Sequence, residues 1–148
     1  MLIQLLVGSI VSAINITLHA TVTMIAIWIA RSAARRSTSR PLLYLAAVMI
    51  ATSLVLMAAH TLEVFVWSLA YAIVNAAPDD ANLVYFAFVN YTTLGYGDVT
   101  PLAKWRLLGP MTAMNGVLMF GWSTALIFEV LIKAIGHHAS APGSSDEL

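Results

Sequence analysis

Seven consecutive residues near the middle of the chain could do chemistry with their backbone, namely Thr92-Thr93-Leu94-Gly95-Tyr96-Gly97-Asp98. Gly95 and Gly97 can adopt positive φ at no steric cost, so successive carbonyl oxygens of such a loop can face one axis. Oxygens arranged in this way can replace the water around a cation. Thr93 adds a hydroxyl at one end, and the Tyr96 ring can point away from the axis and hold the loop open. These residue types favour cation coordination.

The composition places this loop in a membrane. Hydrophobic residues make up 60% of the 148 residues and charged residues only 9%, and the mean hydropathy is +0.86, unlike a soluble domain of average usage. No Asp, Glu, Lys or Arg occurs in residues 2–30, 42–62 or 107–128. Each window reaches the roughly 20 residues that a helix needs to cross the hydrocarbon. The sequence therefore predicts an all-α membrane protein with three transmembrane helices.

Four arginines and no acidic residue lie in residues 31–40, between the first two windows. The positive-inside rule makes this loop cytoplasmic, with the N-terminus outside and the C-terminus in the cytoplasm of a multi-pass protein of the cell (inner) membrane. The expected segments are an extra N-terminal transmembrane helix (1–30), a basic loop (31–40), an outer transmembrane helix (41–77), a re-entrant helix with the glycine loop (78–103), an inner transmembrane helix (104–135) and a disordered tail (136–148).

The stretch before the glycine loop is predicted to form a half-length helix from Asn82 to Thr92. Asp79, Asp80 or Asn82 could cap its first turn, and the preceding Pro78 favours a helix start. The carboxyl end of this helix meets the glycine loop and carries a partial negative charge of about half an elementary charge. We therefore expect a re-entrant segment whose dipole stabilises a cation.

From about Pro41 to Ile135 the chain resembles the pore domain of the potassium-channel superfamily, a module also found in two-pore-domain-type ion channels. Gly116 falls at the position of that family's inner-helix hinge. The resemblance implies a homotetramer with a selectivity filter and a tetrameric pore, because one filter strand cannot coordinate an ion alone. It is carried by residues 92–98, 99–101 and 115–121 and, for a group of small bacterial three-helix ion channels, by residues 59–63 and 121–125.

The resemblance also implies roles for individual residues. K⁺ would bind the carbonyls of Thr93, Leu94, Gly95 and Tyr96, with Gly97 completing the filter. Support and the outer mouth are assigned to Tyr85, Phe86, Asn90, Thr92 and Asp98. Hinge, cavity and gate are assigned to Gly116, Val117, Phe120, Thr124 and Phe128, with Phe128 able either to close the pore or to face a neighbouring subunit. No cofactor is expected besides K⁺ as the permeant ion.

This chain departs from the family pattern at several filter positions. Leu94 stands where Val or Ile is usual, Tyr85 and Phe86 replace tandem tryptophans, and Val89 replaces a buried glutamate of the bacterial pH-gated channel. Asn90 or Tyr85 is the candidate to tie the filter tyrosine in place of the missing indole. These departures favour a weakly selective monovalent cation channel as one alternative to a potassium channel.

His60 and Glu63 form a second candidate site, because residues at i and i+3 share a helix face. Ionisable groups within membrane spans are costly enough to indicate function. Two hypotheses stay open: a pH-responsive group behind the filter, bonded to the re-entrant helix or to His19, and a structural pair near the outer interface.

Glu129, with His137 and His138, either forms a charged ring at the cytoplasmic mouth or is a solvated helix end. A polar stripe packs the first span on the second and comprises Ser9, Ser12, Asn15, His19 and Thr23.

Other protein classes fit the sequence less well. The formal net charge is zero, which argues against nucleic acid as a partner. The chain has no cysteine and no catalytic motif in recognisable spacing, so an enzyme is not expected. The predicted function is a potassium-selective channel whose partners are the lipid bilayer, K⁺ and three further copies of the chain. A non-conducting accessory subunit and an unknown regulatory partner stay open.

Overall fold

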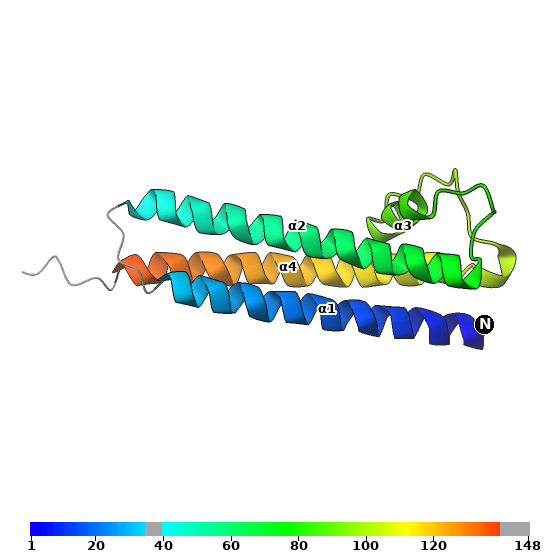
Figure 1. Ribbon diagram of the computed structural model, residues 1–148, viewed down its shortest axis with the longest axis horizontal. Helices are drawn as coiled ribbons and strands as arrows, with labels where there is room; N and C mark the ends of the chain where they lie inside the picture. The colour runs from blue at the N-terminus through cyan, green and yellow to red at the C-terminus, as the bar shows by residue number, and fades with distance from the viewer. Residues whose placement is uncertain (35–39, 140–148) are drawn as a thin grey trace, which may run out of the picture.

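Three long helices lie side by side in the computed structural model, which describes residues 1–34 and 40–139 (Figure 1). Each contains a stretch long and apolar enough to cross a membrane, so the prediction of an all-α membrane protein with three such helices is confirmed. In chain order the elements are α1 (Leu2–Ala34), α2 (Pro41–Val74), α3 (Leu83–Tyr91), the 3-10 turn η1 (Ala103–Trp105) and α4 (Leu108–Ala139).

The ends of α2 and α3 follow from local chemistry. Pro41 opens α2, where its missing N–H costs nothing. Asn75 ends α2 in the left-handed region (φ 50°), and the N–H of Ala76 donates to the Tyr71 carbonyl at 3.0 Å, as in a Schellman motif. The cap of α3 is Asn82, whose Oδ1 accepts a hydrogen bond from the Tyr85 N–H at 3.0 Å. Of the three caps expected for this helix, the structure selects the asparagine.

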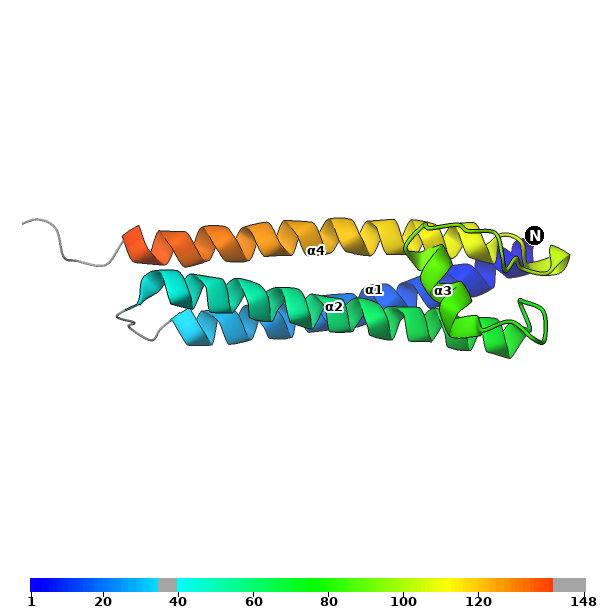
Figure 2. The same cartoon turned by 90° about the horizontal axis from the view of Figure 1, so that it is seen from above.

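The first helix packs against both α2 and α4, which is a broader contact than the predicted packing on α2. Figure 2 shows α3 crossing the bundle near the end that holds the N-terminus. Residues from all four α-helices meet in one core there, including Val11 of α1, Trp67 of α2, Phe86 of α3 and Met119 of α4. Large apolar side chains elsewhere on α1 and α2 stay exposed on the single chain, as expected for surfaces in contact with lipid or with another subunit.

One glycine permits α3 to dock on α4. A Cβ atom at Gly116 would lie 2.0 Å from the carbonyl oxygen of Tyr91 and 2.9 Å from its carbonyl carbon. Both atoms belong to the backbone at the end of α3, so neither can rotate away. The absence of a side chain at position 116 therefore sets how closely the two helices approach, whereas the hinge assigned to Gly116 stays a prediction.

Replacing Gly116 with alanine tests this packing. The added methyl group overlaps the Tyr91 carbonyl, so α3 or α4 must shift, and we expect a loss of about 1–3 kcal/mol in the free energy of unfolding. The fall should appear in the Tm of the purified protein in detergent. Gly121→Ala is the matched control on the same helix, because a Cβ there meets nothing within 4 Å. Equal Tm values for the two variants would contradict the close approach.

Candidate functional site

The backbone of the 92–98 loop alternates in conformation. Positive φ occurs at Thr93 (60°), Gly95 (61°) and Gly97 (78°), that is, at every second residue. A strand whose residues alternate between left- and right-handed conformations can turn its N–H groups to one side and its carbonyls to the other. The prediction that both glycines use their conformational freedom is confirmed.

Thr93 is the residue in this loop whose conformation the sequence did not predict. A threonine in the left-handed region costs about 1–2 kcal/mol relative to its usual conformations. The cause is the end of α3: the Thr93 N–H donates to the Asn90 carbonyl at 3.0 Å, and the Leu94 N–H donates to the Val89 carbonyl at 2.9 Å. These bonds form a Schellman motif with threonine at the position that glycine usually takes.

The side chains of the loop find little packing within their own chain. Leu94 is 53% exposed and Tyr96 is 67% exposed. Asn90 and Tyr85, the two candidates to tie Tyr96, have other partners: the Asn90 amide donates to the Tyr71 hydroxyl at 3.3 Å, and Tyr85 bonds Asp98. The loop is thus held by its backbone and by its two ends, and Tyr96 is left available to a surface outside the single chain.

The far end of the loop is anchored by an exposed hydrogen bond. The Tyr85 hydroxyl donates to Oδ2 of Asp98 at 2.6 Å, and the Val99 N–H donates to Oδ1 at 3.0 Å. The Tyr85 bond holds the pKa of the Asp98 carboxyl below its ordinary value, and the same bond raises the pKa of Tyr85. The neighbouring Phe86 is buried against the ring of Tyr71, with ring centroids 4.9 Å apart. Because its pKa is lowered, the Asp98 carboxyl keeps its negative charge at neutral pH at this end of the loop.

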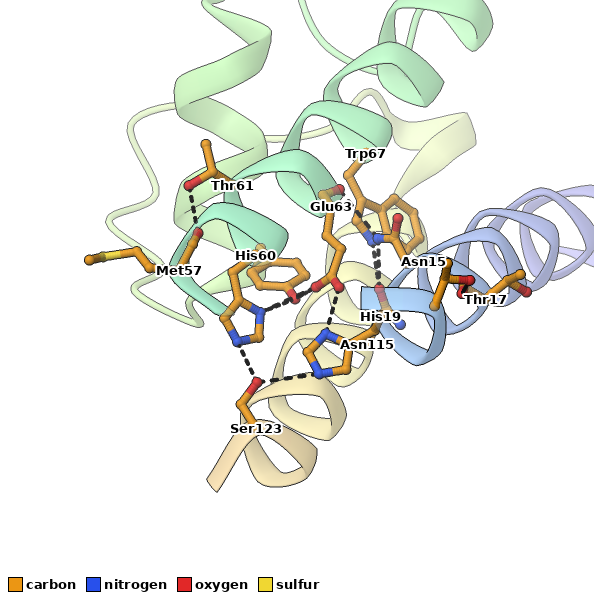
Figure 3. Close-up of polar contacts among 12 residues, drawn as sticks. Asn15, Thr17, His19, Met57, His60, Thr61, Glu63, Trp67, Asn115 and Ser123 are labelled. Atoms are coloured by element: carbon orange, nitrogen blue, oxygen red, sulfur yellow. Dashed lines mark hydrogen bonds and ion pairs between the residues drawn. The ribbon is translucent and has the colours of Figure 1, made fainter. Parts of the chain in front are cut away.

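At the other end of the loop, a buried polar network joins all four α-helices. Oε1 of Glu63 lies 2.8 Å from Nδ1 of His19, and Oε2 lies 3.2 Å from Nδ1 of His60 and accepts a hydrogen bond from the Tyr91 hydroxyl. The far ring nitrogens both contact the Ser123 hydroxyl, at 2.9 Å from His60 and 3.3 Å from His19. Figure 3 shows the two imidazoles flanking the carboxylate, with Ser123 between their outer edges. Glu63 and His19 are fully buried.

A second set of buried polar contacts adjoins the first. The amide of Asn15 donates to the backbone carbonyl of Glu63 at 3.2 Å and to Oδ1 of Asn115 at 3.0 Å. Trp67 donates its indole N–H to the same Asn115 oxygen at 2.9 Å. Polar side chains that bond across helices hold membrane bundles together. The two sets together fix α1 to α2 and α4 at the depth where α3 ends.

The structure shows which residues surround His60 and Glu63, whereas the role of the pair stays a prediction. Both are bonded to Tyr91, the last residue of the short helix, and Glu63 is bonded to His19, as the first hypothesis expected. Sequence reasoning missed Tyr91 and Ser123 as members of this network. The available signals were the place of Tyr91 directly before the loop and that of Ser123 within the 121–125 segment.

The predicted pore residues of α4 lie in two settings. Phe120 and Thr124 line a pocket of about 480 Å³ together with Thr92 and His60. Val117 and Phe128 are 58% and 63% exposed on the single chain. The pocket lies beside the start of the loop and is lined by residues of α2, α3 and α4.

The predicted charged ring near the end of α4 is only partly described. Glu129 pairs with Lys133 at 2.6 Å, and both side chains are about half exposed. The side chains of His137 and His138 lie outside the described part of the chain. The same is true of the side chains of residues 31–39, whose arginines are the basis for the predicted orientation. Orientation in the membrane stays a prediction.

Residues 44–133 match a protein family described as ion channel. The match covers more than half of the 148 residues and includes α3, the 92–98 loop and most of α2 and α4. The chain therefore belongs to this ion channel family and is a multi-pass membrane protein. Membership implies a role in ion permeation. Comparison with curated proteins and with solved structures gives no match.

The bond between Tyr85 and Asp98 can be tested by titration. The depressed pKa means that the carboxylate and its hydrogen bond are present at neutral pH and are lost as the pH falls through that pKa. Tyr85→Phe removes the donor, so we expect the pKa of Asp98 to rise toward its ordinary value. Carboxyl ¹³C NMR of Asp-labelled protein in micelles measures this, with Asp98→Asn assigning the resonance. Tyr44→Phe, at the other end of α2, should leave the titration unchanged; an unchanged Asp98 titration in Tyr85→Phe would refute the contact.

Proposed function

We propose that the protein is a potassium-selective ion channel in which four copies surround one pore and the 92–98 loop is the selectivity filter. The observation that carries the proposal is the positive φ at Thr93, Gly95 and Gly97. This alternation lets the carbonyls of residues 93–96 share one side of the strand, where they can replace the hydration shell of K⁺. Conduction by this mechanism requires K⁺ as the permeant ion and no further cofactor.

The need for several copies follows from the geometry of one strand. A single row of carbonyls borders an ion on one side, so a complete cage takes four strands around an axis. The exposure of Leu94 and Tyr96 supports this arrangement, because their side chains would then pack against neighbouring subunits behind the filter. A homotetramer is therefore part of the proposal.

Two electrostatic features favour a cation on the axis. The carboxyl end of α3 leads directly into the loop and directs its partial negative charge toward the cavity below. At the opposite end, the Asp98 carboxylate raises the cation concentration at the mouth. With the arginine-containing loop in the cytoplasm, this mouth opens to the outside of the cell (inner) membrane. The pore below the filter is assigned to Val117, Phe120, Thr124 and Phe128 of α4.

A weakly selective monovalent cation channel is the second candidate. It is favoured by the partners of Tyr85 and Asn90, which bond Asp98 and Tyr71 and leave Tyr96 without the tie expected for it. A less constrained filter distinguishes K⁺ from Na⁺ less strictly. Reversal potentials under opposed K⁺ and Na⁺ gradients separate the two candidates, and a third, a non-conducting accessory subunit, predicts no current at all.

A flux assay with a filter variant tests conduction. Purified protein in liposomes should dissipate a K⁺ gradient, detected by a potential-sensitive dye, and Ba²⁺ should block the flux at the Thr93 site. Gly95→Ala forces a side chain onto a residue with φ of 61°, so we expect it to abolish the flux. Gly121→Ala has open space for its methyl group and should keep the flux. Full flux through Gly95→Ala, or no flux through the unmodified protein, would refute the proposal.

The ring of Phe128 side chains is proposed as a constriction that closes the cytoplasmic end of the pore by dewetting. Phe128 is 63% exposed on the single chain and lies two helical turns beyond Phe120. Replacing Phe128 with alanine should raise the K⁺ flux in liposomes severalfold. Ile132→Ala, one turn further along α4, controls for loss of apolar surface. Unchanged flux in Phe128→Ala would place the gate elsewhere.

A further inference from the structure

We propose that His19, His60 and Glu63 form a binding site for a divalent transition-metal ion such as Zn²⁺, at the point where α1 joins the ion channel unit. The site is separate from the loop that would conduct K⁺. One potential ligand atom from each of the three residues lies within 4.8 Å of the others. The proposal does not depend on conduction, since binding can be measured on the purified protein alone.

The distances between the ligand atoms suit a four-coordinate ion. Zn²⁺ bonds to nitrogen and oxygen at about 2.0–2.1 Å, so neighbouring ligands of a tetrahedral site lie roughly 3.3 Å apart. Here Nδ1 of His19 and Nδ1 of His60 lie 2.8 Å and 3.2 Å from the two oxygens of Glu63. The Tyr91 hydroxyl lies 3.0 Å from Nδ1 of His60 and is a nearby oxygen that could serve as a fourth ligand. All three ligand atoms lie within 4.8 Å of one another, so binding an ion requires the longest separation to shorten by at most about 1.5 Å.

The hydrogen-bonding capacity of Ser123 allows the tautomers that a metal requires. A hydroxyl can accept two hydrogen bonds but donates only one. The Ser123 hydroxyl lies between the Nε2 atoms of both histidines, so it serves both when each Nε2 carries its proton. Metal-bound histidines usually donate their other ring N–H in this way. In this pair of tautomers both Nδ1 lone pairs face the Glu63 carboxylate, and a cation can lie between them.

The opposite tautomers leave the network incomplete. With a proton on each Nδ1, the imidazoles donate to Glu63, but two Nε2 lone pairs compete for the one hydroxyl hydrogen of Ser123. One buried nitrogen then has no partner, and burying an unpaired polar atom is costly. A divalent ion removes this conflict. Two metal-free states also remove it: an additional proton on one imidazole, or mixed tautomers in which Ser123 accepts from His60 and donates to His19 while the Tyr91 hydroxyl donates to His60. The experiment must therefore distinguish the metal from these metal-free states.

The donor set selects the kind of ion. Two imidazole nitrogens and one carboxylate suit Zn²⁺, whereas Ca²⁺ and Mg²⁺ prefer sites made of oxygen. His19 and Glu63 are fully buried, and His60 is 14% exposed. His60 lines the pocket beside the start of the loop, which gives an ion a route to the site.

The position of the site gives the metal a structural consequence. His19 lies on α1, outside the residues that match the ion channel family, whereas His60, Glu63, Tyr91 and Ser123 lie within them. A bound ion therefore fastens the additional helix to the channel unit. It also fixes Tyr91, which directly precedes the loop.

The test measures metal binding by the full chain, purified in detergent and stripped with a chelator. Zn²⁺ added back should bind as a single ion per chain by elemental analysis and should raise the Tm. Co²⁺ should give the intense visible absorption of a four-coordinate site. His60→Gln and Glu63→Gln should each weaken Zn²⁺ binding at least about 100-fold, and Ser123→Ala about 10–100-fold. Glu129→Gln, an exposed carboxylate paired with Lys133, is the control and should bind normally.

A substitution that exchanges one ligand for another keeps the test decisive if the glutamine variants fail to fold. The chain has no cysteine. In His60→Cys, a thiolate-to-Co²⁺ charge-transfer band can therefore come only from position 60, and its appearance would establish the site. No specific metal binding by the unmodified protein would overturn the proposal and leave the network metal-free. Binding that survives both glutamine substitutions, or His60→Cys protein that binds Co²⁺ without the band, would overturn it as well.

Discussion

The carboxylate of Glu63 is fully buried on a helix long and apolar enough to cross a membrane, so its partners must come from within the protein. An uncompensated charge within a membrane span is costly. Here, the carboxylate is surrounded by His19 of α1, His60 of α2 and Tyr91 of α3, and Ser123 of α4 closes the ring behind the histidines. This requirement gives the helices one relative arrangement, because sliding or rotating any of them would leave a buried polar group without a partner. The rest of the fold depends on this point.

The packing of the helices around Glu63 also sets the position of the 92–98 loop. Tyr91 is bound through its hydroxyl to Glu63, and its backbone carbonyl rests against Gly116 of α4. The end of α3 is thus fixed both laterally and in depth, immediately before Thr92. From there, the Schellman motif at Thr93 starts the alternation of φ that continues through Gly95 and Gly97. The loop makes few side-chain contacts of its own, but its position is well defined because the end of α3, from which it starts, is fixed.

The sequence predicted the elements better than their contacts. Charge-free windows identified the three long helices because a segment in lipid must satisfy its backbone internally, which a helix does. Asn82 was among the expected caps, and positive φ at the glycines follows from their residue type. These are local properties, and the sequence around each position suffices to predict them.

The buried network could be predicted only in part, because it depends on which helix faces meet. The spacing of His60 and Glu63 placed them on one face but left their partners undecided. Tyr91 and Ser123 stand 28 and 60 positions away from Glu63 along the chain, and only the packing of α2 on α3 and α4 brings them together. Similarly, no rule for threonine predicts positive φ at Thr93, since that conformation is imposed by the end of α3.

The central claim is that the carbonyls of residues 93–96 from four chains face one axis and hold a dehydrated cation. Anomalous diffraction from crystals grown with Rb⁺ in place of K⁺ tests it most directly. The account predicts a column of anomalous peaks on a fourfold axis, bordered by the carbonyl oxygens of these residues. Peaks absent from such an axis, or carbonyls turned away from it, would contradict the account.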